Sequence, residues 1–277
     1  MRIFIAGAGY VGERAADLLA AAGHVVTRGR RHPPPGPGWA AFDAVRRDTH
    51  PASLREADAV AYAVAADGFS EDAYRAAYVD GLAAVIESLR DGPAKRLVFV
   101  SSTGVYGQDD GSEVDESSPT VPRGFSGRML LEGEALLRSA PAEAATLRLS
   151  GIYGPGRDRL VAMVRGARPV SERTRRGLTN RIHREDAARA LAHLLLAPRV
   201  DPAYIGSDEA PTPMGEILDW IAARLGLPPP PLGDDAGGPA QRGGDKRCSS
   251  RRLRASGFAF AYPTYREGFG SLVAPVA

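Results

Sequence analysis

The chain has a single cysteine, Cys248, among its 277 residues. One thiol cannot form a disulfide within the chain, and it cannot supply a zinc or iron–sulfur site that needs several cysteines. We therefore expect no metal site. The low cysteine content also suits a reducing, cytoplasmic compartment.

An excess of charge of one sign and long apolar runs are also absent. Lys and Arg number 35 against 33 for Asp and Glu, which gives a formal net charge of +2. Nucleic-acid binding draws on an excess of positive charge that releases counterions, so this balance argues against it. No apolar run approaches the roughly 20 residues that cross a bilayer, and residues 1–12 do not read as a signal peptide. We expect neither a nucleic-acid nor a membrane partner.

Lysine is nearly absent, because Lys95 and Lys246 are the only two in the chain. Almost all the positive charge is arginine, and Ala, Gly and Pro are abundant, as in proteins from GC-rich genomes. A single arginine is therefore weak evidence for a binding site in this sequence.

The first two-thirds of the chain alternate short apolar runs with longer amphipathic segments. The apolar runs do not alternate with polar residues, which is typical of parallel strands buried on both faces. They are Arg2–Ala6, His24–Thr27, Asp58–Val64, Arg96–Ser101 and Thr146–Ile152. Helical patterns lie between them at 11–22, 70–89 and 126–138. This alternation predicts an α/β fold with a Rossmann-like, doubly wound parallel sheet.

The pattern changes after about residue 154. Residues 155–181 are rich in Arg and Gly and have weak periodicity, as expected of an insertion beside a substrate. The later predicted elements are a helix at 184–197, a strand at 203–207, a helix at 212–225, a loop or mobile flap at 228–245 and a short helix begun by Pro263. We expect a dinucleotide-binding domain at 1–154 and a small C-terminal substrate lobe at 155–277, with 181–207 packing back on the first domain.

The strongest motif is Gly7-Ala8-Gly9-Tyr10-Val11-Gly12, which follows the first strand directly and opens a helix. In a dinucleotide site, Gly7 would permit a tight turn and Gly9 would let the backbone approach the pyrophosphate. Gly12 would allow close packing of helix on strand, and the helix start at Tyr10 and Val11 would face the phosphates. A purely structural glycine turn is the alternative.

The end of the second strand bears on the choice between NAD and NADP. An acid about 20 positions after the glycines would bind the ribose 2′-hydroxyl, but residues 27–32 contain none and carry Arg30 and Arg31 instead. A guanidinium there suits a 2′-phosphate. We therefore expect NADP, with NAD as the alternative. The general excess of arginine is the competing explanation.

Several later motifs resemble one family when taken together. They are Ser101-Ser102 with Val105-Tyr106-Gly107, Asp115-Glu116 with Pro119, Arg148 with Tyr153-Gly154-Pro155-Gly156, and His183 with Asp186. This set is similar to the extended short-chain dehydrogenase/reductases, the NAD-dependent epimerase/dehydratase family, over nearly the whole chain. The resemblance implies a nicotinamide cofactor, with Ala63 and Ser101 among its contacts. It also implies that Ser102 bonds the reacting oxygen of the substrate. A serine that only caps its own backbone is the alternative.

The chain departs from this family at the general acid/base, which is a Tyr with a Lys four residues later. The residues four positions before the two lysines are Asp91 and Arg242, so the pair is missing from the sequence. Three substitutes are candidates: Ser126 near the place of the missing Tyr, Arg128 near that of the missing Lys, and Tyr106 close to Ser102. A structural role is the alternative for each of them.

Further candidates lie in the second half of the chain. His183 is a candidate base or anion contact, and a structural hydrogen-bonding role is the alternative, which is more common for a histidine that precedes a helix. We expect Asp186 near a helix N-terminus, where the dipole favours it. A set of arginines could bind an anionic substrate, or could simply be solvated: Arg157, Arg159, Arg165, Arg168, Arg173, Arg175, Arg176 and Arg181.

These features predict an NADP-dependent oxidoreductase or epimerase-like enzyme. It would act on a carbonyl or hydroxyl carbon of a small molecule or sugar nucleotide, with Ser102 holding the oxygen. A cofactor-binding sensor or scaffold without catalysis is one alternative, and a dehydratase-type lyase with bound cofactor is another. The sequence leaves monomer and homodimer open.

Overall fold

The computed structural model describes residues 1–234 and 244–273. By their internal contacts the residues form two compact units. Unit 1 consists of Met1–Val105, Pro122–Arg148 and Ala187–Tyr204. Unit 2 consists of Tyr106–Val121, Leu149–Asp186 and Ile205–Ala277.

The central feature is a seven-stranded sheet with the strand order β11-β7-β5-β4-β1-β2-β3. Its strands are β1 (Arg2–Ala6), β2 (Val25–Arg30), β3 (Trp39–Ala41), β4 (Ala59–Tyr62), β5 (Arg96–Ser102), β7 (Glu143–Leu149) and β11 (Ala203–Gly206). The pairs β1–β2, β1–β4, β2–β3 and β4–β5 are parallel. The predicted α/β fold with a Rossmann-like parallel sheet is confirmed.

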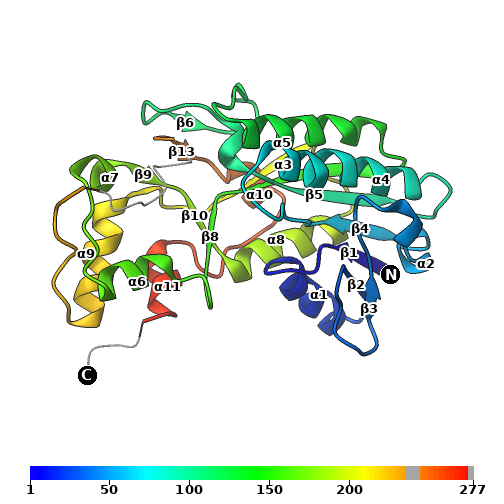
Figure 1. Ribbon diagram of the computed structural model, residues 1–277, viewed down its shortest axis with the longest axis horizontal. Helices are drawn as coiled ribbons and strands as arrows, with labels where there is room; N and C mark the ends of the chain where they lie inside the picture. The colour runs from blue at the N-terminus through cyan, green and yellow to red at the C-terminus, as the bar shows by residue number, and fades with distance from the viewer. Residues whose placement is uncertain (235–243, 274–277) are drawn as a thin grey trace. The chain divides into compact units, whose positions relative to one another are not determined.

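Helices cover both faces of this sheet, with α1 and α8 on one side and α3, α4 and α5 on the other (Figure 1). Their bounds are α1 (Gly12–Ala21), α2 (Ala52–Arg55), α3 (Glu71–Arg75), α4 (Gly81–Ser88), α5 (Phe125–Leu136) and α8 (Arg184–Leu196). Short turns add η1 (Arg47–Thr49), η3 (Thr103–Val105) and η4 (Leu137–Ser139). The central strands β1 and β4 are buried on both faces, which explains their unbroken apolar runs: Ile3, Phe4 and Ile5 of β1 are at most 2% exposed.

The helix predicted over 70–89 is interrupted by a π-helical turn, η2 (Ala76–Asp80). Tyr62 of β4 reaches this turn, and its hydroxyl donates to the carbonyl oxygen of Ala77 at 2.5 Å. A Cβ at Gly81 would lie 2.5 Å from the same hydroxyl. The inserted phenol explains the widened turn, because a side chain that bonds a helix carbonyl opens the regular ladder.

Unit 2 is built from short elements around its own apolar core. Its strands pair as β8 (Gly151–Tyr153) with β10 (Arg181–His183), β9 (Leu178–Thr179) with β12 (Thr212–Pro213), and β6 (Glu113–Val114) with β13 (Arg247–Cys248). Its helices are α6 (Arg159–Arg165), α7 (Glu172–Arg176), α9 (Met214–Leu225), α10 (Arg251–Ala255) and α11 (Tyr265–Gly270). The core joins Leu160 and Val164 of α6, Ile217 and Ile221 of α9, and Phe269 of α11.

Three predictions about this half need correction or lie outside the described residues. The weakly periodic stretch 155–181 contains the helices α6 and α7. The last helix begins at Tyr265 and not at Pro263, because the Thr264 side chain caps it in a capping box with Glu267. Residues 235–243, the middle of the predicted flap, lie outside the described residues.

Candidate active site

The glycine-rich turn joins β1 to α1 where the strand order reverses between β1 and β4. Gly7 has φ +88°, and a Cβ there would lie 2.5 Å from the backbone nitrogen of Val64, just after β4. A Cβ at Gly12 would lie 2.6 Å from the carbonyl oxygen of Gly7. Only glycine fits at these two positions, because one needs a left-handed backbone and both lie against main chain.

Gly9 differs, because a Cβ there would meet nothing within 4 Å. Gly9 is exposed at the start of α1, and the N-cap residue Val11 provides no side-chain hydrogen bond to the first turn. A helix N-terminus carries partial positive charge and directs N–H groups outward. The open space in front of it fits the pyrophosphate of a dinucleotide, as expected for Gly9, Tyr10 and Val11. Ala63 borders the same turn, since a Cβ at Gly7 would lie 2.6 Å from its carbonyl carbon.

The two arginines expected to select NADP have different surroundings. Arg30, the last residue of β2, is exposed, and its guanidinium lies 5.9 Å from the ring centroid of Trp39. Arg31 forms a double hydrogen bond with Asp67, at 2.6 and 2.5 Å, and this lowers the pKa of that carboxyl. Arg31 is thus already paired with a carboxylate that lies 36 positions away in the sequence, and the local sequence did not indicate this pair. Arg30 is the arginine better disposed to meet a 2′-phosphate.

The two serines at the end of β5 have different hydrogen-bond partners. The Ser102 hydroxyl is half-buried and accepts a hydrogen bond from the N–H of Gly104 at 3.1 Å. The Ser101 hydroxyl donates to Glu134 of α5 at 2.7 Å. Glu134 also forms a buried ion pair with Arg148, with Nη2 to Oε2 at 2.6 Å. Ser101 is therefore bonded to α5, and its predicted contact with the cofactor stays a prediction.

The first turn of α5 lies close to the end of β5. A Cβ at Gly127 would lie 2.7 Å from the carbonyl oxygen of Gly104, two residues after Ser102. Ser126, half-buried, precedes this glycine, whereas Arg128 is exposed. The structure thus brings the start of α5, with Ser126, to the turn that follows Ser102.

Tyr106 is 2% exposed and is the first residue of unit 2. It follows Ser102 after the single 3₁₀ turn η3. Its carbonyl oxygen accepts a hydrogen bond from Lys246 Nζ at 3.0 Å. Lys246 was not among the residues singled out in the sequence, and no local pattern could have linked the two, since they stand 140 positions apart.

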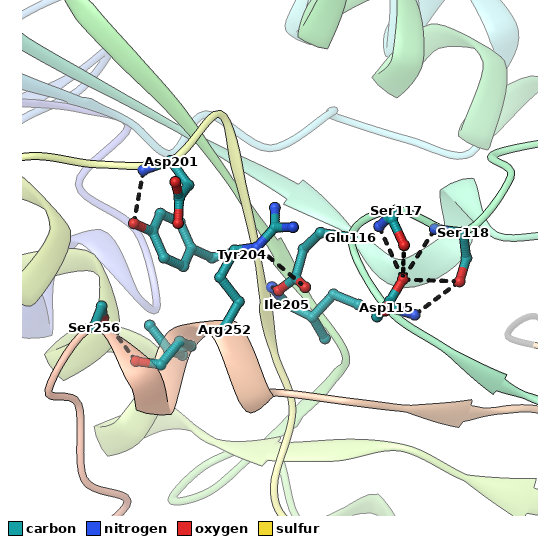
Figure 2. Close-up of polar contacts among 10 residues, drawn as sticks. Asp115, Glu116, Ser117, Ser118, Asp201, Tyr204, Ile205, Arg252 and Ser256 are labelled. Carbon is teal, nitrogen blue, oxygen red and sulfur yellow. Dashed lines mark hydrogen bonds and ion pairs between the residues drawn. The ribbon is translucent and has the colours of Figure 1, made fainter.

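The acidic side chains of the Asp115-Glu116 motif form hydrogen bonds and an ion pair within the protein (Figure 2). Asp115 Oδ1 accepts hydrogen bonds from the N–H groups of Ser117 at 2.9 Å and Ser118 at 3.1 Å. These bonds close a turn in which the aspartate serves as acceptor.

Glu116 points the other way and is nearly inaccessible, with a side-chain exposure of 3%. Its Oε1 accepts from the N–H of Ile205 at 2.8 Å, and its Oε2 lies 3.7 Å from Arg252 Nε (Figure 2). Burial raises the pKa of this carboxyl. Within unit 2, the motif therefore contacts Ile205 and Arg252 of α10.

His183 and Asp186 are also in structural contacts. His183 is 4% exposed, its Nδ1 accepts from the N–H of Glu185 at 3.2 Å, and burial lowers its pKa. Asp186 is fully buried in the first turn of α8, and it accepts from the N–H groups of Ala261 and Tyr262, both at 2.8 Å. These contacts match the structural alternative for His183.

The arginine set lies in unit 2, and two of its members line a surface hollow of about 660 Å³ between α7, α9 and α11. There Arg175 Nη2 lies 2.7 Å from Asp219, and Arg176 Nε lies 2.8 Å from Glu172. Burial lowers the pKa of Arg181 to about 10. An anion that binds Arg175 or Arg176 has to replace one of these carboxylates.

Residues 1–234 and 244–273 lack two kinds of feature. No group of three or more His, Cys, Asp or Glu side chains there could hold a metal ion. No helix in those ranges is both long and apolar enough to cross a membrane.

The open turn at Gly9, placed at the reversal of a parallel sheet, defines a dinucleotide-binding α/β protein. The model of the NAD-dependent epimerase/dehydratase family matches residues 3–205, and the chain belongs to that family. The resemblance seen in the sequence motifs is thereby confirmed.

Three relatives illustrate the similarity. A solved structure from Methylobacillus flagellatus, described as an NAD-dependent epimerase/dehydratase, is 36% identical, covers 98% of this chain and 97% of its own, and has a TM-score of 0.79. Protein YeeZ of Escherichia coli K12 is 31% identical over 189 residues, which are 67% of this chain and 65% of YeeZ. The 3-diazoavenalumate denitrifying reductase of a Streptomyces species is 26% identical over 98% of this chain and 99% of its own length.

Proposed function

We propose that the chain is an NADP-dependent oxidoreductase that acts on the carbonyl or hydroxyl carbon of a small molecule or sugar nucleotide. Family membership supports the coarser statement, an oxidoreductase or epimerase-like enzyme that uses a nicotinamide cofactor. The observation that carries the proposal is the open space at Gly9, between two glycines that no larger residue could replace. The Streptomyces relative, named as a reductase, supports a redox reaction.

NADP is proposed over NAD because of the end of β2. Arg30 is exposed there, and its segment lacks the acid that would bind a 2′-hydroxyl. A guanidinium forms charge-assisted hydrogen bonds with a phosphate, and these are about twice as strong as neutral ones.

Ser102 is proposed to hold the reacting oxygen of the substrate. Its Oγ accepts the Gly104 N–H, so its own O–H proton remains to be donated. A bound nicotinamide would supply the hydride chemistry at the neighbouring carbon. The hydroxyl of Ser102 would orient that carbon and stabilise negative charge that develops on its oxygen.

Tyr106 is the proposed proton donor. A phenol ordinarily keeps its proton at neutral pH, so it can give that proton to a substrate but is a poor base. This favours reduction of a carbonyl over oxidation of an alcohol as the fast direction. A small, anionic substrate remains part of the proposal, carried by the arginines of unit 2.

The test of this function is the Gly9→Val variant. A Cβ at this position has no described heavy atom within 4 Å, so the variant should fold with a melting temperature near that of the wild type. It should nevertheless fail to bind NADPH in a fluorescence titration, because the side chain fills the space of the pyrophosphate. Gly7→Val is the contrasting variant and should not fold, since its Cβ would overlap the main chain at Val64. Wild-type NADPH affinity in Gly9→Val would refute the site.

A turnover assay distinguishes an enzyme from a cofactor-binding sensor without catalysis. Wild-type protein is mixed with NADPH and a panel of aldehydes, ketones and sugar nucleotides, and NADPH oxidation is followed by absorbance. Oxidation that falls about 10²- to 10³-fold in Ser102→Ala, the usual range for one oxyanion donor, supports the enzyme. NADPH binding without oxidation against the whole panel supports the sensor.

A further inference from the structure

Lys246 is one of only two lysines in the chain, and it is 1% exposed. Its Nζ donates a hydrogen bond to the main-chain carbonyl oxygen of Tyr106 at 3.0 Å. The other lysine, Lys95, is exposed. Burying an ammonium group is unfavourable unless it is well hydrogen-bonded, so the contact with Tyr106 is a specific feature of the fold.

The segment 244–248, which we name the strap, runs beside the chain that follows Tyr106. The Asp245 N–H donates to Asp109 Oδ1 at 2.8 Å, and the Gly111 N–H donates to the Asp245 carbonyl at 2.8 Å. The last two residues of the strap form β13, which pairs in parallel with β6 (Figure 1). Hydrogen bonds therefore fix the strap along 106–114.

Asn180 fastens the strap through its carboxamide. Its Nδ2 donates to the Lys246 carbonyl at 3.0 Å, and its Oδ1 accepts from the Cys248 N–H at 2.8 Å. The strap also approaches Gln108 closely, because a Cβ at Gly244 would lie 2.5 Å from the Gln108 carbonyl oxygen. Main-chain bonds thus hold Lys246 in register with Tyr106.

We propose that Lys246 is the positioning residue for Tyr106. This inference rests on the proposed function, in which Tyr106 donates the proton. Tyr106 is buried, so the direction of its phenol depends on how its own main chain is held. Lys246 holds that main chain through its carbonyl oxygen, from a distant segment, in a chain that has no Lys four residues after a Tyr.

The first test compares Lys246→Met, Lys246→Arg and the control Lys95→Met by NADPH oxidation with the carbonyl panel. Lys246→Met should lower kcat about 10- to 100-fold, as expected of a group displaced by about 1 Å. The Kd for NADPH should not change, since the glycine turn lies elsewhere. Lys246→Arg should recover part of kcat, and Lys95→Met should match the wild type.

The double variant Lys246→Met/Tyr106→Phe distinguishes positioning from general damage. If Lys246 acts through Tyr106, adding Lys246→Met to Tyr106→Phe should lower kcat less than about 2-fold further. Full multiplication of the two losses would overturn the proposal, and so would a Lys246→Met variant that loses thermal stability but keeps kcat.

Hydrogen exchange tests the positioning without turnover. Amides in 106–114 should exchange at least 10-fold faster in Lys246→Met than in the wild type or Lys95→Met, while β1 and β4 stay protected. Unchanged protection of 106–114 would overturn the positioning role. If the wild type binds NADPH but oxidises none, the proposed function fails, and the exchange result still decides whether Lys246 holds Tyr106.

Discussion

At the scale of single residues, the environment of each arginine decides its use more than its position in the sequence. Arg28, Arg30 and Arg31 stand at or just after the end of β2, yet Arg28 is paired with Asp17 at 2.9 Å and Arg31 with Asp67 at 2.5 Å. Arg30 lies near the Trp39 ring. Exposed ion pairs are weak, typically about 0–1 kcal/mol, so Arg31 could exchange Asp67 for a phosphate at small cost.

This difference gives a prediction on cofactor choice. Arg30→Ala should weaken NADPH binding about 10- to 100-fold and leave NADH binding nearly unchanged, because only NADPH carries the 2′-phosphate. Arg28→Ala is the matched control and should affect neither cofactor strongly. The measurement is a fluorescence titration with each cofactor. An equal loss for NADPH and NADH would mean that Arg30 does not contact the 2′-phosphate.

A second residue-scale prediction concerns the acid. Tyr106→Phe should lower kcat about 10²- to 10⁴-fold if its phenol gives the proton, the usual range for general acid catalysis. The same assay on Ser126→Ala and Arg128→Ala tests the two other candidates. A Tyr106→Phe variant with full activity would move the proton transfer to one of them or to water.

At the scale of elements, α11 packs against β8 through one close contact. Tyr153 of β8 stacks on Phe269 of α11, with ring centroids 4.4 Å apart. A Cβ at Gly268 would lie 1.6 Å from the Tyr153 hydroxyl, which has no hydrogen-bond partner among residues 1–234 and 244–273. The tyrosine ring therefore passes where any side chain at 268 would lie.

Gly268→Ala should consequently destabilise the protein by about 1–3 kcal/mol or more, the range for overpacking a core. Tyr153→Phe should be neutral or stabilising, because it removes a buried hydroxyl without a partner. Thermal or urea unfolding measures both. A Gly268→Ala variant as stable as the wild type would show that α11 can shift away from β8.

Some elements were difficult to predict because they are short or because one apolar run contains two strands. The single apolar run predicted at 146–152 is divided into β7 and β8, which belong to different sheets. The strand β3 is three residues long, and α7 is five residues long, so neither shows a full period. Local hydrophobic pattern detects long elements and fails for short ones.

At the scale of the whole molecule, the buried carboxyl of Asp208 should shape how stability depends on pH. Asp208 is 2% exposed, its Oδ2 accepts no hydrogen bond from the part of the chain that the structure describes, and burial raises its pKa to about 8. The folded state therefore holds a proton that the unfolded state releases near pH 4. Between about pH 4 and pH 8 the contribution of Asp208 to stability falls as pH rises, by up to about 1.4 kcal/mol per pH unit.

Asp208→Asn should remove this dependence. The melting temperature of the variant should rise relative to the wild type as pH increases from 5 to 8, and the difference should level off above pH 8. Thermal unfolding across this range is the measurement, and taking the difference cancels the other titrating groups. A constant difference from pH 5 to 8 would mean that Asp208 is ionised in the folded protein throughout.

Location and assembly also belong to the whole molecule, and they stay predictions. The sequence suggests a cytoplasmic protein, a monomer or homodimer, without nucleic-acid or membrane partners. Size-exclusion chromatography with light scattering tests the oligomeric state, and no change of mass with added DNA is the expected result.

The parallel sheet, the family and the glycine turn could all be predicted from the sequence. Each depends on local information: buried strands need unbroken apolar runs, and Gly7 and Gly12 lie where only glycine fits. The end of β5 at Ser102 was predictable to within one residue for the same reason.

Which of these side chains already have a partner within the protein depends on contacts between distant segments. Asp67 meets Arg31 across 36 positions, Glu134 meets Ser101 across 33, and Lys246 meets Tyr106 across 140. Such partners leave no periodic trace in the sequence, because hydrogen bonds and ion pairs form between whichever segments the fold brings together. The missing Tyr–Lys pair was visible in the sequence, but the buried lysine beside Tyr106 required the folded chain.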